Sequence, residues 1–245
     1  MKKFVALVCA AVLLSVLCSC STASEIKSEN GSDTSQETLT YEERVEKMVG
    51  KSGDLGTELD DIYEAIVSNI AVANDEYVGK SFKFTAKVVE VTNTGATLEL
   101  CILPFAYLEN LPSHSGIRII KAKANMDTLR KLANGGVYQF VGEITEVQDN
   151  TYTCILMDNL LVADDTVEIE VYCDHNSPWA KYTFNYTAHY KFIYDGQLDG
   201  DYVGLWVKMK VKINYSERKE YELNWSTTTC TCYHISEVVS IEKAE

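Results

Sequence analysis

Apolar and polar residues alternate along much of the chain after Ser81, and only a β-strand with one buried face has this period. A short helical pattern over residues 126–134, with Leu129 and Leu132 facing inward, interrupts the alternation, and Gly135-Gly136 can end that helix in a left-handed cap. Three strands, a short helix and two strands is the order of an OB-fold barrel. The predicted strands cover residues 81–91, 96–103, 116–123, 137–147 and 152–162.

Helical spacing precedes the barrel. Apolar residues recur every three or four positions from Leu59 to Ile70, which predicts an amphipathic leading helix that Thr57 caps and that ends near Ala73. A shorter helix is expected over residues 41–51, before the interruption at Gly53 and Gly56. The chain is therefore predicted to be mainly β, with a leading helix followed by a five-stranded barrel.

Alternation resumes at Thr166 and predicts a C-terminal antiparallel meander sheet of four or five strands. One face of such a sheet is buried and the other is wet, so we expect the barrel, the leading helices or a partner protein to cover it. The lysines at 208, 210 and 212 are expected to face Glu220 and Glu222 across a strand pair.

The N-terminus has the layout of a secretory signal. Lys2 and Lys3 precede an apolar run over 4–17, which is too short to span a bilayer comfortably. The run ends in Leu-Cys-Ser-Cys at 17–20, which resembles the lipobox of bacterial lipoproteins and implies that Cys20 carries palmitate-type acyl chains. The alternative is a plain signal peptide cut nearby. We expect export, with lipid anchoring to the outer face of the cell membrane or the periplasmic face of an envelope membrane.

These patterns divide the chain into four parts. Residues 1–19 form the signal peptide, 20–40 a polar tether, 41–165 the leading helices and barrel, and 166–245 a β-rich C-terminal domain. The net charge is −14, and removing the two signal lysines makes it more negative. An acidic surface repels phosphate backbones, so the sequence predicts no nucleic-acid partner.

Core and turn positions between residues 57 and 162 form a recognisable pattern, at Glu58, Leu59, Tyr63, Asn69, Ala73, Tyr77–Lys80, Leu129, Leu132, Gly136 and Val141–Glu143. At these positions, the segment resembles the bacterial OB-fold family called tRNA anticodon-binding-like. The resemblance implies an OB fold, but the family name implies nucleic acid only by distant ancestry, and a fold does not confer a function. An apolar link between Pro104 and Pro112 departs from the pattern.

Cysteine and histidine alternate in two C-terminal segments, which contain Cys173 and His175, and then Cys230, Cys232 and His234. Alternate strand positions share a face, so each segment could direct its ligands together as zinc requires. Extracytoplasmic cysteines are more often oxidised, and the mature body adds Cys101 and Cys154 to give an odd total of five. We therefore favour buried thiols or one disulfide, with no metal and no cofactor.

Aromatic residues are dense after residue 178 and admit two interpretations. Aromatics suit strand cores, which is the interpretation that we favour, but exposed aromatic platforms bind sugars and peptides. Trp179 lies in the loop segment Asn-Ser-Pro-Trp-Ala-Lys and is the best candidate for exposure.

Recognised catalytic motifs are absent from the sequence, including Gly-x-Ser-x-Gly, His-Glu-x-x-His and phosphate-binding glycine loops. The sequence therefore predicts a membrane-anchored, extracytoplasmic, non-catalytic binding or interaction module. Its expected partners are the membrane, through the lipid anchor, and an envelope protein or small ligand that the sequence does not identify. The alternatives are a structural accessory of a cell-envelope complex and an unrecognised envelope enzyme.

Overall fold

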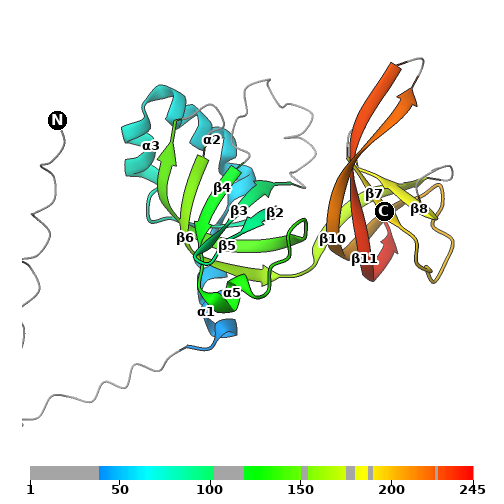
Figure 1. Cartoon of the computed structure of the whole chain (residues 1–245), viewed down its shortest axis with the longest axis horizontal. Helices are drawn as coiled ribbons and strands as arrows, with labels where there is room; N and C mark the ends of the chain where they lie inside the picture. The colour runs from blue at the N-terminus through cyan, green and yellow to red at the C-terminus, as the bar shows by residue number, and fades with distance from the viewer. Residues whose placement is uncertain are drawn as a thin grey trace, which may run out of the picture. The chain divides into compact units, whose positions relative to one another are not determined.

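The computed structural model describes residues 39–101, 119–149, 154–174, 180–186, 190–223 and 226–244, with side chains omitted at 221–223 and 226–228, and also at Cys154. Strands dominate it: a closed five-stranded barrel follows the leading helices, and further strands lie outside that ring. The predicted fold class is confirmed at this level (Figure 1).

The ring contains five strands in the order β2-β3-β4-β6-β5, and pairing of β2 with β5 closes it. β4 and β6 run parallel, while the other neighbours in the ring run antiparallel. This circular order is that of an OB-like barrel. The elements are β2 (Ser81–Val91), β3 (Gly95–Leu100), β4 (Ile119–Lys123), α5 (Met126–Leu129), β5 (Val137–Gln148) and β6 (Cys154–Asp164).

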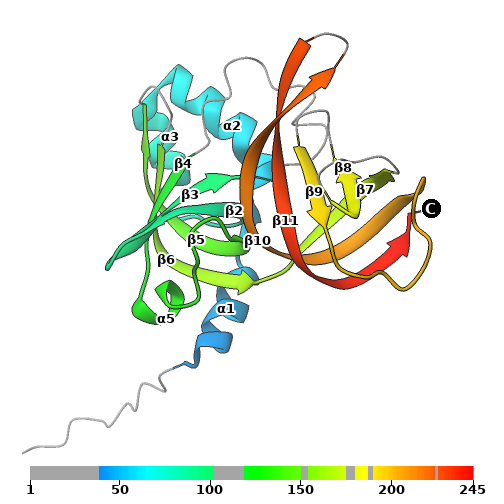
Figure 2. The ribbon, with the colours of Figure 1, turned by 45° about the vertical axis from the view of Figure 1, so that its right-hand side comes forward.

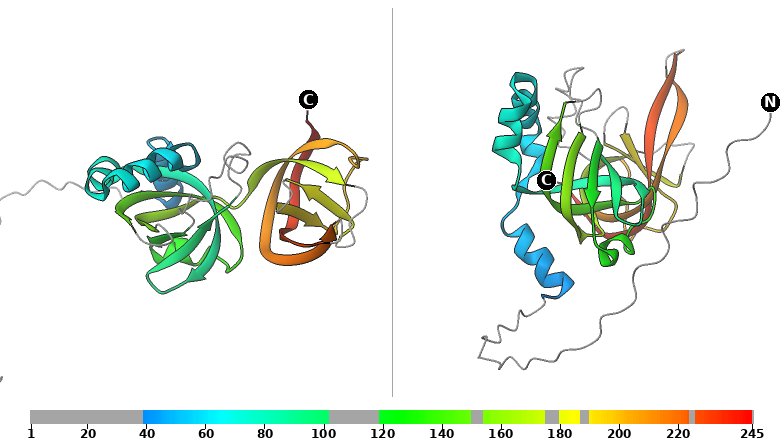
Figure 3. Two further views of the ribbon diagram at one scale, coloured as in Figure 1. Left: turned by 90° about the horizontal axis from the view of Figure 1, so that it is seen from above. Right: turned by 60° about the vertical axis from the view of Figure 1, so that its left-hand side comes forward.

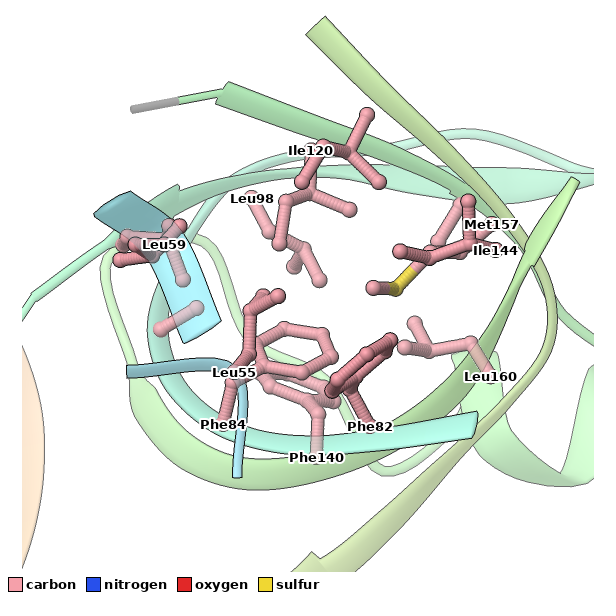
Figure 4. Packing of buried hydrophobic residues seen from close by; sticks show 14 of the residues in the cluster. Leu55, Leu59, Phe82, Phe84, Leu98, Ile120, Phe140, Ile144, Met157 and Leu160 are labelled. Atoms are coloured by element: carbon pink, nitrogen blue, oxygen red, sulfur yellow. The ribbon is translucent and has the colours of Figure 1, made fainter. Parts of the chain in front are cut away.

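Alternating apolar residues fill the interior of this barrel. In β2 every second residue from Phe82 to Val88 is buried, as the period-two pattern predicts. Phe84 and Phe140 stack with ring centroids 5.7 Å apart, and Leu98, Ile120 and Met157 are buried in the same cluster (Figure 4). The predicted left-handed cap is wrong, because α5 ends at Leu129 and its C-cap, Arg130, is right-handed. Gly135, with φ 83°, lies instead in the turn that leads into β5.

The leading helices are α1 (Tyr41–Val49), α2 (Leu55–Ser68) and α3 (Ile70–Tyr77), and the two-residue strand β1 (Gly53–Asp54) pairs with β2. The predicted cap at Thr57 is wrong, because the Asp54 carboxylate accepts from Gly56 N at 2.8 Å and the helix begins at Leu55. The prediction of a single leading helix up to Ala73 is wrong as well. The chain forms two helices there, because the Asn69 side chain accepts a hydrogen bond from Ala71 N and caps α3. α2 buries its apolar stripe against the barrel.

α1 is attached to the barrel through Tyr41. Its hydroxyl accepts a hydrogen bond from Val162 N at 2.8 Å, and Lys131 Nζ lies 3.5 Å from the centre of its ring. A capping box between Thr40 and Glu43 starts the helix. Among the described residues, the longest and most apolar helices still fall short of what crossing a membrane requires.

The strands outside the first ring are β7 (Val167–Asp174), β8 (Tyr182–Asn185), β9 (Tyr190–Tyr194), β10 (Trp206–Leu223) and β11 (Ser226–Lys243). They pair in the order β7-β8-β9-β11-β10, and β10 pairs back with β7. Figure 2 shows β10 and β11 side by side along their length, and the left view of Figure 3 shows these five strands curling into a second ring. We call this ring the C-terminal barrel.

The C-terminal barrel adds a detail that the expected meander lacked. β9 and β11 run parallel, as β4 and β6 do in the first ring, so the two rings have the same circular strand order. We expected another element to cover the aromatic face of this sheet. Closure covers much of that face instead, because inward residues such as Phe184, Phe192 and Tyr233 pack together in one buried cluster.

A carboxylate that stabilises the connection between β6 and β7 gives a first testable prediction. Burial alone would raise the pKa of Asp164, but hydrogen bonds from Thr166 Oγ1, Thr166 N and Lys210 Nζ outweigh it and hold the pKa below its usual value. Asp164→Ala should reduce the free energy of unfolding by about 1–3 kcal/mol at pH 7. Because the folded-state pKa is lowered, this contribution is present above the unfolded-state pKa near 4 and is lost as the pH falls through the folded-state pKa.

Urea unfolding at pH 7 and at pH values below 4 measures both effects. Asp165→Ala is the matched control, since among the described residues Asp165 pairs with Lys212 alone, and the Lys212 side chain is solvated. This variant should change stability by less than about 0.5 kcal/mol. Equal losses in the two variants, or a loss in Asp164→Ala that does not shrink in acid, would contradict the prediction.

Candidate binding site on the outer face of the C-terminal barrel

The interiors of both barrels are occupied by side chains. Phe84 and Phe140 fill the first, and Phe192 stacks on Tyr233 at 5.2 Å in the second. Small barrels of this size are packed cores rather than cavities. A ligand must therefore bind at an outer surface or at the loops.

Most of the C-terminal aromatics belong to the core, as we favoured. Tyr182, Tyr186, Tyr190 and Tyr194 are partly buried and pack against the second cluster. Trp179 lies outside the described residues. Trp206 behaves differently, because 51% of its surface is exposed at the start of β10. Its ring lies 5.9 Å from that of Tyr172 on β7, with the planes tilted by 59°.

Charged residues follow this aromatic pair along the same outer face. Because Tyr172 is opposite Trp206, the next outward position places Glu170 opposite Lys208, and Glu242 of β11 lies on the other side of Lys208. The position after that aligns Glu168, Lys210 and Ser240 in the same way. The expected pairing of these lysines with Glu220 and Glu222 is wrong, because those glutamates lie opposite Thr229 and Thr227.

These residues line a depression of about 440 Å³, which we call the outer groove. Its lining consists of Glu168, Ile169, Glu170, Lys208, Met209, Lys210, Ser240 and Glu242. Lys210 forms an ion pair with Asp164 at 3.1 Å. Within the described part of the chain, Glu168, Glu170, Lys208 and Glu242 form no hydrogen bond or ion pair through their side chains. Their charged groups are therefore available to a ligand.

A second depression, of about 560 Å³, lies beside Tyr138, Asp164, Asp165 and Lys212. Its charged groups already have partners, since Asp164 pairs with Lys210, and Lys212 pairs with both Asp165 and Glu237. The pKa of Lys212 is raised by its hydrogen bonds to those two carboxylates. A ligand here would have to displace existing ion pairs, so we regard the outer groove as the better site.

The cysteine and histidine residues that suggested zinc do not converge. Cys173 points into the C-terminal barrel, whereas Cys230 and Cys232 lie in a separate buried cluster with their Sγ atoms 3.6 Å apart. His234 hydrogen-bonds to Glu217 Oε1 at 2.7 Å, with its ring stacked 3.9 Å from that of Tyr215. His175 and the Cys154 side chain lie outside the description, and the described side chains include no group of three potential metal ligands.

The described thiols are buried, and burial raises the pKa of three of them. Burial raises the pKa of Cys101 to about 12 and that of Cys173 to about 11, and burial together with the hydrogen bond to Cys230 raises the pKa of Cys232 to about 12. The thiolate is the reactive form of cysteine, so these side chains make poor nucleophiles.

Thiol labelling tests this arrangement. In native protein, we expect a maleimide to label Cys101, Cys173, Cys230 and Cys232 at least tenfold more slowly than after unfolding in guanidinium, because burial protects all four thiols. Peptide mass spectrometry resolves each site. Rapid native labelling of Cys232 would contradict the buried placement. If unfolded Cys230 and Cys232 label only after a reductant is added, the pair forms a disulfide, which was the alternative left open by the sequence.

The strand order and the parallel third-to-fifth pairing define an OB-like barrel protein. The chain matches no protein-family model and no curated protein. A similar solved structure is a putative nucleic acid-binding lipoprotein from Klebsiella pneumoniae subsp. pneumoniae MGH 78578, with 18% identity and a TM-score of 0.34 over 47% of this chain and 95% of that one. The tRNA anticodon-binding-like family is thus not confirmed, while the OB-like barrel is.

One expectation must be corrected. The acidic net charge led us to predict that nucleic acid is not a partner, and this is contradicted by the description of the Klebsiella protein as nucleic acid-binding. Net charge sums over the whole surface, whereas binding depends on the local arrangement of cations and stacking aromatics. We therefore withdraw the exclusion of nucleic acid.

Proposed function

We propose that this protein is an extracytoplasmic lipoprotein, anchored to a membrane through Cys20, that acts as a non-catalytic binding module. The observation that carries the proposal is the outer groove, where charged side chains without described partners adjoin the exposed Trp206. Rigid strands present all of these groups, which favours a preorganised binding surface. The lipobox-like segment at 17–20 supports the anchoring.

The chemistry of the described titratable groups supports binding rather than catalysis. Burial raises the pKa values of the Cys101 and Cys173 thiols and of the Tyr186 and Tyr233 hydroxyls, so these groups remain protonated near pH 7. The Glu217 carboxylate has a lowered pKa because Lys219 and His234 donate hydrogen bonds to it. A general base works best with a pKa near the operating pH, and shifts in these directions move the groups away from it.

The test uses the full-length, lipidated protein in phospholipid vesicles. Separated glycan, protein, lipid and nucleic-acid fractions of a bacterial envelope preparation are titrated against it in a sedimentation assay. We expect at least one fraction to bind saturably and to be recovered chemically unchanged. Turnover of the bound material would favour the alternative of an envelope enzyme, and absence of saturable binding to any fraction would overturn the proposal.

A further inference from the structure

We propose that the outer groove together with Trp206 and Tyr172 binds a neutral oligosaccharide, with a sugar ring stacked on Trp206 and its hydroxyls bonded to the charged side chains. This assignment rests on the proposed function as a binding module and names the ligand class. It concerns the outer face of β7, β10 and β11, away from the aromatic residues that fill the barrel.

The aromatic pair supplies the apolar half of the site. Trp206 leaves 51% of its surface in water, although a tryptophan side chain gains more from burial than most residues. Among the described residues, the exposed large apolar side chains include just one other aromatic, Tyr215. Trp206 has Tyr172 beside it at 5.9 Å, so the two rings form a tilted platform. The face of a sugar ring carries C–H groups, which pack against such an aromatic surface.

The charge pattern of the outer groove favours a ligand without net charge. Lys208 lies between Glu170 and Glu242 in the strand register, and Lys210 lies between Glu168 and Ser240. A cationic ligand would meet these lysines, and an anionic ligand would meet the glutamates. A hydroxyl group both donates and accepts hydrogen bonds, so it can bond to a carboxylate on one side and to an ammonium group on the other. Alternating charges therefore suit a polyhydroxylated neutral molecule.

The dimensions of the groove fit a short glycan. Outward residues along one strand are roughly 7 Å apart, so the distance from Trp206 to Lys210 is roughly 14 Å. This length accommodates a few linked sugar rings. The groove volume of about 440 Å³ also falls within the range of small-molecule sites. Because the ligand-facing groups stand on three paired strands, little ordering of the protein is needed on binding.

The experiment measures binding of neutral oligosaccharides to the full-length, lipidated protein in vesicles. The probes are hexamers of glucose in β-1,4 and α-1,4 linkage, of xylose and of N-acetylglucosamine. Calorimetry and tryptophan fluorescence measure their binding. We expect at least one hexamer to bind with a dissociation constant of about 10–500 μM, at the weak end of specific association. Trp206→Ala should weaken it at least tenfold, Glu170→Gln at least threefold, and Trp206→Tyr should retain most of the affinity.

Tyr215→Ala is the matched control. Tyr215 is also an aromatic residue of β10, 46% exposed and outside the outer groove, so its loss should leave the affinity within twofold. Circular dichroism and urea unfolding confirm that each variant is folded. Equal weakening by Tyr215→Ala and Trp206→Ala would overturn the assignment of the site to the groove.

Other outcomes separate this inference from the proposed function. If none of the hexamers binds and a lysine-rich peptide, an oligonucleotide or a second copy of the chain binds in a Trp206-dependent manner, the glycan assignment is wrong and the binding module stands. If an envelope fraction binds and Trp206→Ala has no effect, the groove is not its site, and again only the inference fails. If neither hexamers nor envelope fractions bind, both proposals fail.

Discussion

Phe140→Ala should reduce the free energy of unfolding by about 3–5 kcal/mol, the usual effect of removing a fully buried aromatic side chain. Phe140 has no exposed surface, stacks on Phe84 at 5.7 Å and contacts the edge of Tyr138 at 5.9 Å. Domains are typically stable by about 5–15 kcal/mol, so this single change removes a large fraction of the total. The measurement is the midpoint of urea unfolding, with the m-value as a check on the two-state assumption.

Val89→Ala on β2 is the control, because Val89 is solvent-exposed and its truncation should cost less than about 0.5 kcal/mol. A loss below about 1 kcal/mol for Phe140→Ala would contradict its placement at the centre of the barrel. Phe184→Ala extends the test to the second cluster. If residues 41–165 and 166–245 are separate domains, as predicted, the two variants should shift different unfolding transitions.

Cys20→Ala should transfer essentially all of the protein from the membrane fraction to the soluble or secreted fraction, or leave it unprocessed. The physical reason is the size of the lipid contribution. Each buried methylene contributes about 0.8 kcal/mol, and two or three acyl chains are needed for stable anchoring. Fractionation of cells and incorporation of labelled palmitate measure the two parts of this effect.

Cys18→Ala is the matched control, since it changes the neighbouring cysteine and leaves a small residue in the lipobox-like segment. It should retain both membrane association and label. Unchanged lipid incorporation in Cys20→Ala would show that Cys20 is not the modified residue. A soluble wild-type protein without label would favour the alternative of a plain signal peptide.

The first barrel could be predicted because local features determine much of it. Alternation locates its strands, and Gly135 provides the left-handed conformation of the turn before β5. The helix starts were harder, because Asp54 and Thr57 are both good capping residues and their backbone geometry decides between them. Asn69 ends one helix and begins another, and a periodic apolar pattern that continues across it conceals the break.

The C-terminal barrel and the candidate site were less predictable. Alternation shows which residues share a face but not which strand is the neighbour, so the parallel pairing of β9 with β11 was missed. The predicted cross-strand partners of Lys208 and Lys210 were wrong for the same reason. Trp206 precedes Val207 in an alternating segment, and its exposure follows once Val207 is assigned to the interior. The inward position of Val207 could be predicted from the sequence, whereas the pairing of Trp206 with Tyr172 could not.

The circular strand order has a consequence for how the chain reaches its native state. Each ring is closed by strands that are distant in sequence, β2 with β5 and β7 with β10, and its last strand, β6 or β11, adds a parallel contact. Such non-local pairing slows folding toward milliseconds or seconds. In a chain that emerges from its N-terminus, the first ring has all of its strands once residue 164 is available, whereas the second must wait for residue 243. During that interval β9 and β10 lack their partner β11 and expose unpaired edges, which raises the risk of aggregation.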